Sequence, residues 1–305
     1  MTKRYPQAIM MSCETPWDGN YQFMEDVFRE EVRAVLGKGF NHIYIFGTAG
    51  EGYAVTMSQF KDVVRVFREE TDIDDVYPNV GIIAMSTGQV LEKVAVAYDE
   101  GFRIFQLTLP PWGVLNDGEY LTFFKEVCGC FPDASFIHYN LPRAKRVLLG
   151  PDYGLLESKI PNFVGTKNLR FDINDIHSIA SHTSEIQHFW GEHSFPLGAM
   201  YGEASLLSSW GGLFTKKTKE FFDYGVTKQF DKLFQMFPEY LAVIDAFESP
   251  GFPDDRIDGA WDKMIVRASG INMPLRLLSP YHGYDDAVFN ACLKNVKDNF
   301  PDWIG

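Results

Sequence analysis

The sequence contains an amine and a phenol that each end a β-rich run, and these two groups suit imine chemistry. Lys167 ends a run that begins near Asn162, and Tyr139 ends one that begins near Ser135. Burial of an amine at such a position lowers its pKa toward neutrality. A neutral lysine attacks a ketone and forms an imine, which withdraws electrons from the neighbouring carbon. The alternatives are a surface lysine beyond the strand and a structural tyrosine whose hydroxyl bonds a loop.

A glycine-rich segment follows another β-rich run and provides groups that suit an anion. Gly47, Thr48, Ala49 and Gly50 come directly after the run that begins near Asn41. Glycines let backbone N–H groups approach an anion closely, and the Thr48 hydroxyl adds a further donor. The segment therefore predicts a cradle for a carboxylate, with a tight turn that binds nothing as the alternative.

The sequence offers no metal pattern. The seven histidines are scattered without HxH or HExxH spacing, and one CxC pair lacks the second pair that a zinc site needs. The four cysteines are expected to be reduced thiols; they are Cys13, Cys128, Cys130 and Cys292. We therefore expect an enzyme without a metal and without an organic cofactor.

Charge and hydropathy exclude several classes of partner. The chain has 28 Lys and Arg against 41 Asp and Glu, a net charge of −13, which repels phosphate backbones and disfavours nucleic-acid binding. No apolar run approaches the roughly 18 residues of a membrane-spanning helix. The amino-terminal residues lack the pattern of a signal peptide. We expect a cytoplasmic protein whose partner is a small molecule.

Eight β-rich runs alternate with segments of helical period. Phe60, Val63, Val64 and Phe67 illustrate the helical spacing, and capping-box patterns begin at residues 56, 86 and 116. Runs such as residues 80–84 are apolar on both faces, as parallel strands covered by helices are. The runs begin near Gln7, Asn41, Asn79, Arg103, Ser135, Asn162, Ile186 and Ala204.

This alternation predicts an α/β fold, a (β/α)8 TIM barrel over residues 1–227. A doubly wound open sheet is the alternative, but residues 12–17 lack the glycine-rich phosphate turn that it requires. Three further helices are expected in residues 228–305, as a carboxy-terminal helical extension packed on the outside of the barrel. Active sites of such barrels lie at the carboxyl ends of the strands, where Lys167, Tyr139 and Thr48 are expected.

In their order along the chain these segments resemble the dihydrodipicolinate synthase/N-acetylneuraminate lyase family of Schiff-base-forming, pyruvate-dependent lyases. The spacing of 28 residues between Tyr139 and Lys167 adds to the specificity of the set. The matching segments are T-P-W-D-G-N at 15–20, G-T-A-G-E at 47–51, Y-N-L-P at 139–142, G-T-K at 165–167, G-E at 191–192 and L-R-L-L-S-P at 275–280.

The resemblance implies catalytic roles. Lys167 would form the Schiff base with a 2-keto acid, and Tyr139 would move protons to and from the substrate. Thr48, with the N–H of Ala49, would hold the carboxylate of the keto acid, and Gly47 would lie beside it.

Further substrate contacts are implied by the same resemblance. Asn140 and Arg143 belong to the segment around Y-N-L-P, while Gly191 and Leu206 fall where the family lines its pocket with main-chain groups. The family also implies a homo-oligomer, either a dimer or a tetramer.

Three departures from the family pattern bear on the substrate. Ala49 replaces a second threonine of the cradle. The arginine with which dihydrodipicolinate synthases grip a second carboxylate falls at Ala144, between Arg143 and the pair Lys145 and Arg146. The tyrosine that they lend across a subunit interface is absent from residues 110–112.

We therefore expect an aldolase or dehydratase that acts on a sugar-derived or aromatic 2-keto acid and forms pyruvate. The alternatives are a true 4-hydroxy-tetrahydrodipicolinate synthase, which condenses pyruvate with aspartate semialdehyde, and a non-catalytic keto-acid sensor. Trp112 would either stack on an apolar substrate or be a buried structural indole.

Overall fold

The computed structural model describes residues 4–169, 172–250 and 256–304, and its centre is a closed barrel of eight parallel strands. Each strand begins within two residues of a run predicted from the sequence, and β1 pairs with β8 to close the barrel. The TIM-barrel prediction is thus confirmed. The strands are β1 (Ile9–Ser12), β2 (His42–Ile45), β3 (Tyr77–Ile82), β4 (Ile104–Leu107), β5 (Ser135–Asn140), β6 (Phe163–Asn168), β7 (Gln187–Trp190) and β8 (Ser205–Ser208).

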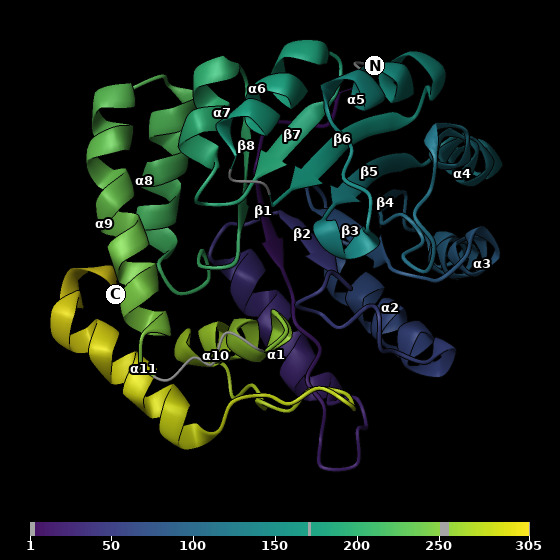
Figure 1. The fold of residues 1–305 in the computed structure, drawn as a ribbon. Helices are drawn as coiled ribbons and strands as arrows, with labels where there is room; N and C mark the ends of the chain where they lie inside the picture. Colours follow the sequence, from purple (N-terminus) through teal and green to yellow (C-terminus); the bar gives the residue numbers. More distant parts are fainter. Residues whose placement is uncertain (1–3, 170–171, 251–255, 305) are drawn as a thin grey trace.

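Helices follow the strands and surround the barrel (Figure 1). None of the helices in the described part of the chain is both long and apolar enough to cross a membrane. The helices of the barrel are α1 (Glu25–Gly37), α2 (Met57–Thr71), α3 (Thr87–Asp99), α4 (Asp117–Cys130), a 3-10 turn η1 (Pro142–Ala144), α5 (Gly150–Lys159), α6 (Ile173–His182), α7 (Phe195–Tyr201) and α8 (Thr215–Val226).

Helix starts follow the predicted capping signals with one difference. Thr56 and Asn116 form complete capping boxes at the starts of α2 and α4. At α3 the Ser86 side chain accepts from the Gln89 N–H, but the Gln89 amide oxygen accepts from Met85 N–H, one residue before the cap. The helix start is nevertheless the one that the hydroxyl at Ser86 indicates.

Side chains on neighbouring parallel strands share a face when their residues are in register, and this rule brings the predicted groups together. Tyr139 on β5 is in register with Lys167 on β6, which is in register with Phe189 on β7. Phe189 belongs to the apolar cluster inside the barrel, together with Tyr44 and Leu207. The larger core lies between the strands and the surrounding helices.

Three helices follow the barrel, namely α9 (Phe230–Glu248), α10 (Gly259–Ala268) and α11 (Asp286–Asn299), and a 3-10 turn η2 (Pro301–Trp303) ends the described chain. In Figure 1, α9 runs beside α8 and α11, while α10 lies next to α1. The extension does not lie only on the outside of the barrel, because buried Lys263 of α10 pairs with Glu51, which follows β2. The domain division between residues 227 and 228 stays a prediction.

Candidate active site

Lys167 lies at the carboxyl end of β6 and is only 2% exposed. Its Nζ is 3.9 Å from the ring centroid of Tyr44 on one side and 3.9 Å from that of Tyr139 on the other. Burial lowers the pKa of Lys167 to about 7, against the attraction of nearby carboxylates led by Glu14. A large fraction of this amine is therefore neutral, and nucleophilic, near neutral pH.

Tyr139 places its hydroxyl beside Thr48. The Tyr139 OH and the Thr48 Oγ1 are 3.2 Å apart, and both side chains are buried. Burial raises the pKa of Tyr139 well above its ordinary value, so the phenol keeps its proton at neutral pH. A protonated phenol next to the amine is a proton donor within reach of a group bound to Lys167.

The segment after β2 forms a tight turn beside Lys167. The N–H of Gly52 donates to the Gly47 carbonyl at 3.2 Å, and the N–H of Glu51 donates to the Thr48 carbonyl at 3.1 Å. A Cβ at Gly47 would come within 2.8 Å of a Tyr44 ring carbon and 3.3 Å of the Lys167 Nζ. A side chain at position 47 would therefore force the Tyr44 ring or the Lys167 amine to move.

Lys167, Tyr139, Thr48 and Tyr44 line a pocket of about 460 Å³ at the carboxyl ends of the strands. The volume lies within the range of small-molecule sites, roughly 300–1,000 Å³. Hydrogen-bond acceptors and indole rings also line the pocket. The lining includes Tyr44, Thr48, Ala49, Tyr139, Leu141, Pro142, Arg143, Lys167, Leu169, Gly191, Glu192, His193, Leu207, Ser209, Trp210, Ile244, Glu248, Asp258, Trp261 and Asp262.

The three cations of residues 143–146 go to different places. Arg143 reaches the pocket, but its guanidinium makes a bidentate pair with Asp258 of the loop before α10 at 2.9 and 2.8 Å. Lys145 donates to the Trp112 carbonyl, and Arg146 donates to Leu115 and to carboxylates outside the pocket. The guanidinium that lines the pocket is therefore already paired with a carboxylate.

Of the two positions predicted to line the pocket with main-chain groups, Gly191 and Leu206, only the first is found in its lining. Gly191 lines the pocket as expected. Leu206 does not line it, because its side chain lies in the core between strands and helices and its N–H donates to the Ala8 carbonyl. Leu207 lines the pocket in its place. Neighbouring side chains of a strand point to opposite faces, which explains why the side chain of Leu207, and not that of Leu206, reaches the pocket. A substrate contact through main-chain groups at these positions stays a prediction.

Asn140 faces away from the pocket for the same reason. Its Nδ2 donates to the Leu148 carbonyl and to the Asn168 Oδ1, and its Oδ1 accepts from the Leu148 N–H. Asn140 thus holds the loop after β5 in place and does not line the pocket.

Trp112 is 81% exposed and lies outside the pocket. The prediction of a buried structural indole is therefore wrong, and the stacking prediction lacks a contact with the pocket. Its ring lies 5.9 Å from the Lys145 Nζ, on the outer side of the loop.

The sequence analysis missed several groups around the amine. Glu14 lies two residues after β1, so the rule that selects strand ends could have found it, whereas Glu192, two residues after β7, is part of the predicted G-E segment but was given no role. Asp258 and Asp262 come from the start of α10, and no sequence signal places that helix over the barrel mouth. Within the described residues, no group of three or more His, Cys, Asp or Glu is arranged to hold a metal ion.

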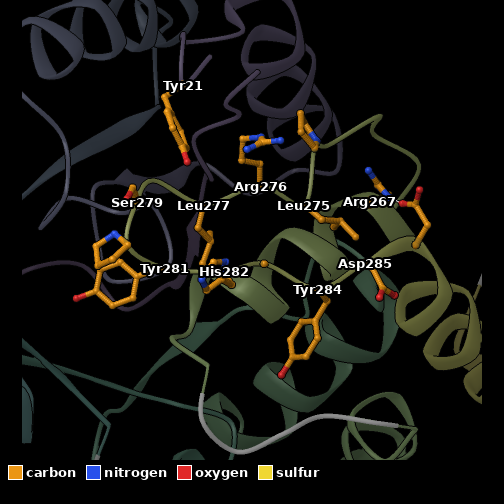
Figure 2. A pocket seen from close by; sticks show the side chains of 14 residues that line it. Tyr21, Arg267, Leu275, Arg276, Leu277, Ser279, Tyr281, His282, Tyr284 and Asp285 are labelled. Atoms are coloured by element: carbon orange, nitrogen blue, oxygen red, sulfur yellow. Dashed lines mark hydrogen bonds and ion pairs between the residues drawn. The ribbon is translucent and has the colours of Figure 1, made fainter. Parts of the chain in front are cut away.

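A second hollow, of about 480 Å³, lies along residues 274–286 (Figure 2). Arg276 and Tyr21 border it, with the guanidinium carbon 5.6 Å from the ring centroid. No residue from a strand end lines this hollow, and it contains neither Lys167 nor Tyr139. The pocket around Lys167 is therefore the candidate active site.

Comparison with characterised proteins finds N-acetylneuraminate lyases among the relatives. The chain is 26% identical to N-acetylneuraminate lyase of Sus scrofa over 185 residues, covering 57% of this chain and 56% of that protein. It is 27% identical to N-acetylneuraminate lyase of Homo sapiens over 181 residues, covering 57% and 55%. The chain thus spans little more than half the length of the curated relatives that it matches.

Solved structures share the whole fold. A prophage protein of the dihydrodipicolinic acid synthase family from E. coli K12, in complex with pyruvate, has a TM-score of 0.85 at 14% identity, covering 96% of this chain and 98% of that one. A catalytic lysine mutant of a Ruminococcus gnavus sialic acid aldolase has a TM-score of 0.83 at 15% identity, covering 98% of each chain. Residues 5–251 match the model of the dihydrodipicolinate synthetase family. The chain belongs to that family.

Proposed function

We propose that this protein is a class I lyase that forms a Schiff base between Lys167 and a 2-keto acid. The observation that carries the proposal is the buried amine of Lys167, whose pKa is lowered to about 7, beside the protonated phenol of Tyr139. The relatives support it, because those matched in sequence are N-acetylneuraminate lyases and a structural relative was solved with pyruvate.

The geometry supports a sequence of proton-balanced steps. The neutral amine of Lys167 attacks the keto carbon, while the Thr48 hydroxyl and the backbone N–H of Ala49 hold the carboxylate. The Tyr139 phenol donates a proton to the carbinolamine hydroxyl and regains one from solvent, so that the hydroxyl leaves as water and a protonated imine remains. The imine accepts the electron pair of the bond that breaks, and Tyr139 moves the proton that the leaving group gives up or gains.

We infer a sugar-derived keto acid as the first choice of substrate. Glu192, Ser209 and Asp262 offer acceptors for substrate hydroxyls, and Trp210 and Trp261 offer apolar ring surface in the same pocket. Because Asp258 occupies Arg143, a second carboxylate on the substrate lacks a guanidinium partner there. This arrangement disfavours 4-hydroxy-tetrahydrodipicolinate synthase. An aromatic keto acid fits the indoles and is the second candidate, with cleavage of a C–C or a C–O bond.

Borohydride reduction in the presence of pyruvate tests the central claim. We expect mass to be added to the peptide that contains Lys167, and not to that peptide in Lys167→Met. Lys145→Met is a matched control outside the pocket and should label normally. Labelling confined to another lysine, or no labelling, would overturn the assignment and leave the keto-acid sensor as the better explanation.

A substrate screen then separates the finer alternatives. Release of pyruvate from 2-keto-3-deoxy sugar acids, sialic acid and aromatic keto acids would rank the substrate classes. Turnover with pyruvate and aspartate semialdehyde at the rate of an ordinary enzyme, about 10 per second, would instead support the synthase.

We also propose that the protein is a homo-oligomer, a dimer or a tetramer, as its family resemblance implies. Light scattering on the purified protein measures this directly, and a monomer at working concentration would refute it.

A further inference from the structure

A small internal cavity lies behind the wall of the candidate active site. Ser209 and Asp262 line both the pocket and this cavity, so the two spaces share a wall. The cavity is about 20 Å³, which is room for one water molecule. Glu14, after β1, and Glu31, on α1, also line it.

The carboxyl groups around the cavity are buried and incompletely hydrogen-bonded. The Glu14 N–H donates to Glu31 Oε1 at 2.7 Å. Within the described part of the chain, Oε2 of Glu14 and Oε2 of Glu31 have no hydrogen-bond partner. Three buried carboxylates cannot all stay charged in so small a space, so this cluster retains protons near neutral pH. Burial raises the pKa of Glu14 to about 7, and those of Glu31 and Asp262 well above their ordinary range.

Two lysines near the cluster direct their hydrogen bonds to other groups. Lys38 lines the cavity, but its Nζ donates to the Gly212 carbonyl at 2.8 Å. Lys263 Nζ donates to Glu51 Oε1 at 2.5 Å and to the Arg276 carbonyl at 2.6 Å. Its hydrogen bonds therefore go to the loop after β2 and to the carboxy-terminal segment. The proton content of the cavity is left to the carboxyl groups themselves.

Polar groups connect this cavity with Lys167. Ser12 lines the cavity with Glu14 and is in register with Tyr44 on the neighbouring strand. Tyr44 lines the pocket, and its ring centroid is 3.9 Å from the Lys167 Nζ. Ser12, which lines the cavity, and Tyr44, which lines the pocket, are thus in register on neighbouring strands, while Asp262 of α10 lines both spaces.

We propose that Glu14 accepts the proton that the Lys167 ammonium must lose before it attacks a keto acid, while Asp262 stays protonated in the shared wall. The inference rests on the proposed function. Glu14 lies outside the pocket lining, so it is a positioning residue that holds a proton and sets the charge state of the amine.

The proton balance of this step closes within the site. The ammonium becomes an amine and one carboxylate becomes a carboxylic acid. The amine adds to the ketone to give a carbinolamine, whose hydroxyl takes a proton from Tyr139 and leaves as water, and the stored proton then returns to Tyr139 in place of one from solvent. The product is the protonated imine and a carboxylate, so the step exchanges no proton with solvent.

Other charged and titratable groups lie near the amine, and each is a possible alternative acceptor of its proton. Asp258 is paired with Arg143, and the phenols of Tyr44 and Tyr139 stay protonated because burial raises the pKa of each. On the β7 side the neighbour of Lys167 in register is the apolar Phe189. Glu192, His193 and Glu248 line the same pocket, and burial raises the pKa of Glu192 and lowers that of His193. Asp262 keeps its proton because burial raises its pKa as well. Glu14, whose pKa is raised to about 7, is therefore the carboxyl group matched to the amine near neutral pH.

The test is the pH dependence of imine formation with pyruvate, measured by borohydride quenching and mass spectrometry in wild type, Glu14→Gln and Asp262→Asn. In the wild type, exchange between two groups gives a transition broader than that of one titrating amine. In Glu14→Gln the transition should narrow and its midpoint should fall by about one pH unit, because the anion that stabilises the ammonium is gone. Glu126→Gln, the same change on the exposed face of α4, should leave the profile unchanged.

The outcomes separate the two proposals. A wild type that forms no imine overturns the proposed function, and with it this inference. A wild type that forms the imine while Glu14→Gln keeps the same profile, or moves its midpoint to higher pH, overturns the inference alone. Asp262→Asn should leave the midpoint in place, because burial raises the pKa of Asp262 and the side chain is already uncharged. If melting curves show that Glu14→Gln does not fold, Glu14→Ala decides on the same criteria.

Discussion

The buried pair of Lys263 and Glu51 gives the sharpest prediction about how the carboxy-terminal extension supports the active site. Both side chains are completely buried, and the Nζ lies 2.5 Å from Oε1 of Glu51. Glu51 also accepts from the Trp17 Nε1 at 2.9 Å and from the Leu278 N–H at 2.6 Å. One carboxylate thus joins the loop after β1, the loop after β2, α10 and the segment before α11.

Lys263→Met keeps the length and apolar stem of the side chain while removing the charge. Removing one partner of a buried ion pair costs about 3–5 kcal/mol, because the other charge stays buried without compensation. Trp17 and Leu278 still donate to Glu51, which favours the lower end of that range. The Arg276 carbonyl loses its donor as well, which adds to the cost.

The assay is urea unfolding followed by circular dichroism, with the midpoint and the slope fitted separately. We expect a lower midpoint at an unchanged slope, and slower imine formation, because Glu51 directly follows the turn that contains Thr48. Glu51→Gln combined with Lys263→Met removes the uncompensated charge and should recover about 1 kcal/mol or more. Lys294→Met, which breaks the exposed pair with Asp298, is the matched control and should hardly move the midpoint.

Two results would refute this reasoning. If Lys263→Met unfolds at the wild-type midpoint, the pair does not hold the extension to the barrel. If the double variant is as unstable as the single one, the cost comes from lost packing around Lys263 and not from an unpaired charge.

Three further predictions concern the site itself. Tyr139→Phe keeps the ring but removes the proton donor, so imine formation should slow and bond cleavage should fall about 10²–10⁴-fold; single-turnover rates beside the melting temperature measure this, and a near-wild-type rate would make Tyr139 a scaffold residue. Imine formation by the wild type should rise as the pH passes upward through about 7, because the Lys167 ammonium below that pH is not nucleophilic; a quenched time course at each pH shows it, and a midpoint near the free-lysine value of about 10.4 contradicts it. Gly47→Ala should abolish imine formation in a folded protein, because the new methyl meets the Tyr44 ring and the Lys167 amine at 2.8 and 3.3 Å; normal trapping would show that the ring moves aside.

Much of the fold was predictable because its signals are local. The strands that are covered on both faces are apolar runs, and hydroxyl or amide caps mark the starts of α2, α3 and α4. The positions of Lys167 and Tyr139 at two neighbouring strand ends follow from the alternation of strands and helices alone. Their common direction required only register, which a regular barrel supplies.

The direction of a side chain was harder to predict, because a shift of one residue in a strand reverses the face to which it points. Leu206 and Asn140 lie in strands that were predicted correctly, yet their side chains turn away from the pocket that Leu207 and Tyr139 line. A strand boundary placed from propensity is uncertain by about a residue or more, and one residue reverses the face.

The sequence by itself determined the barrel, the amine, the phenol and the glycine-rich turn, since each depends on residues close together in the chain. Only the tertiary structure decided the surroundings of that amine. Arg143 and Asp258 are 115 residues apart, and Lys263 and Glu51 are 212 apart. Pairs at such separations are made when α10 packs over the barrel mouth, and no local pattern encodes which carboxylate a cation will meet. The electrostatic state of Lys167 is therefore a property of the folded chain, because burial and the carboxyl groups brought beside it set its charge.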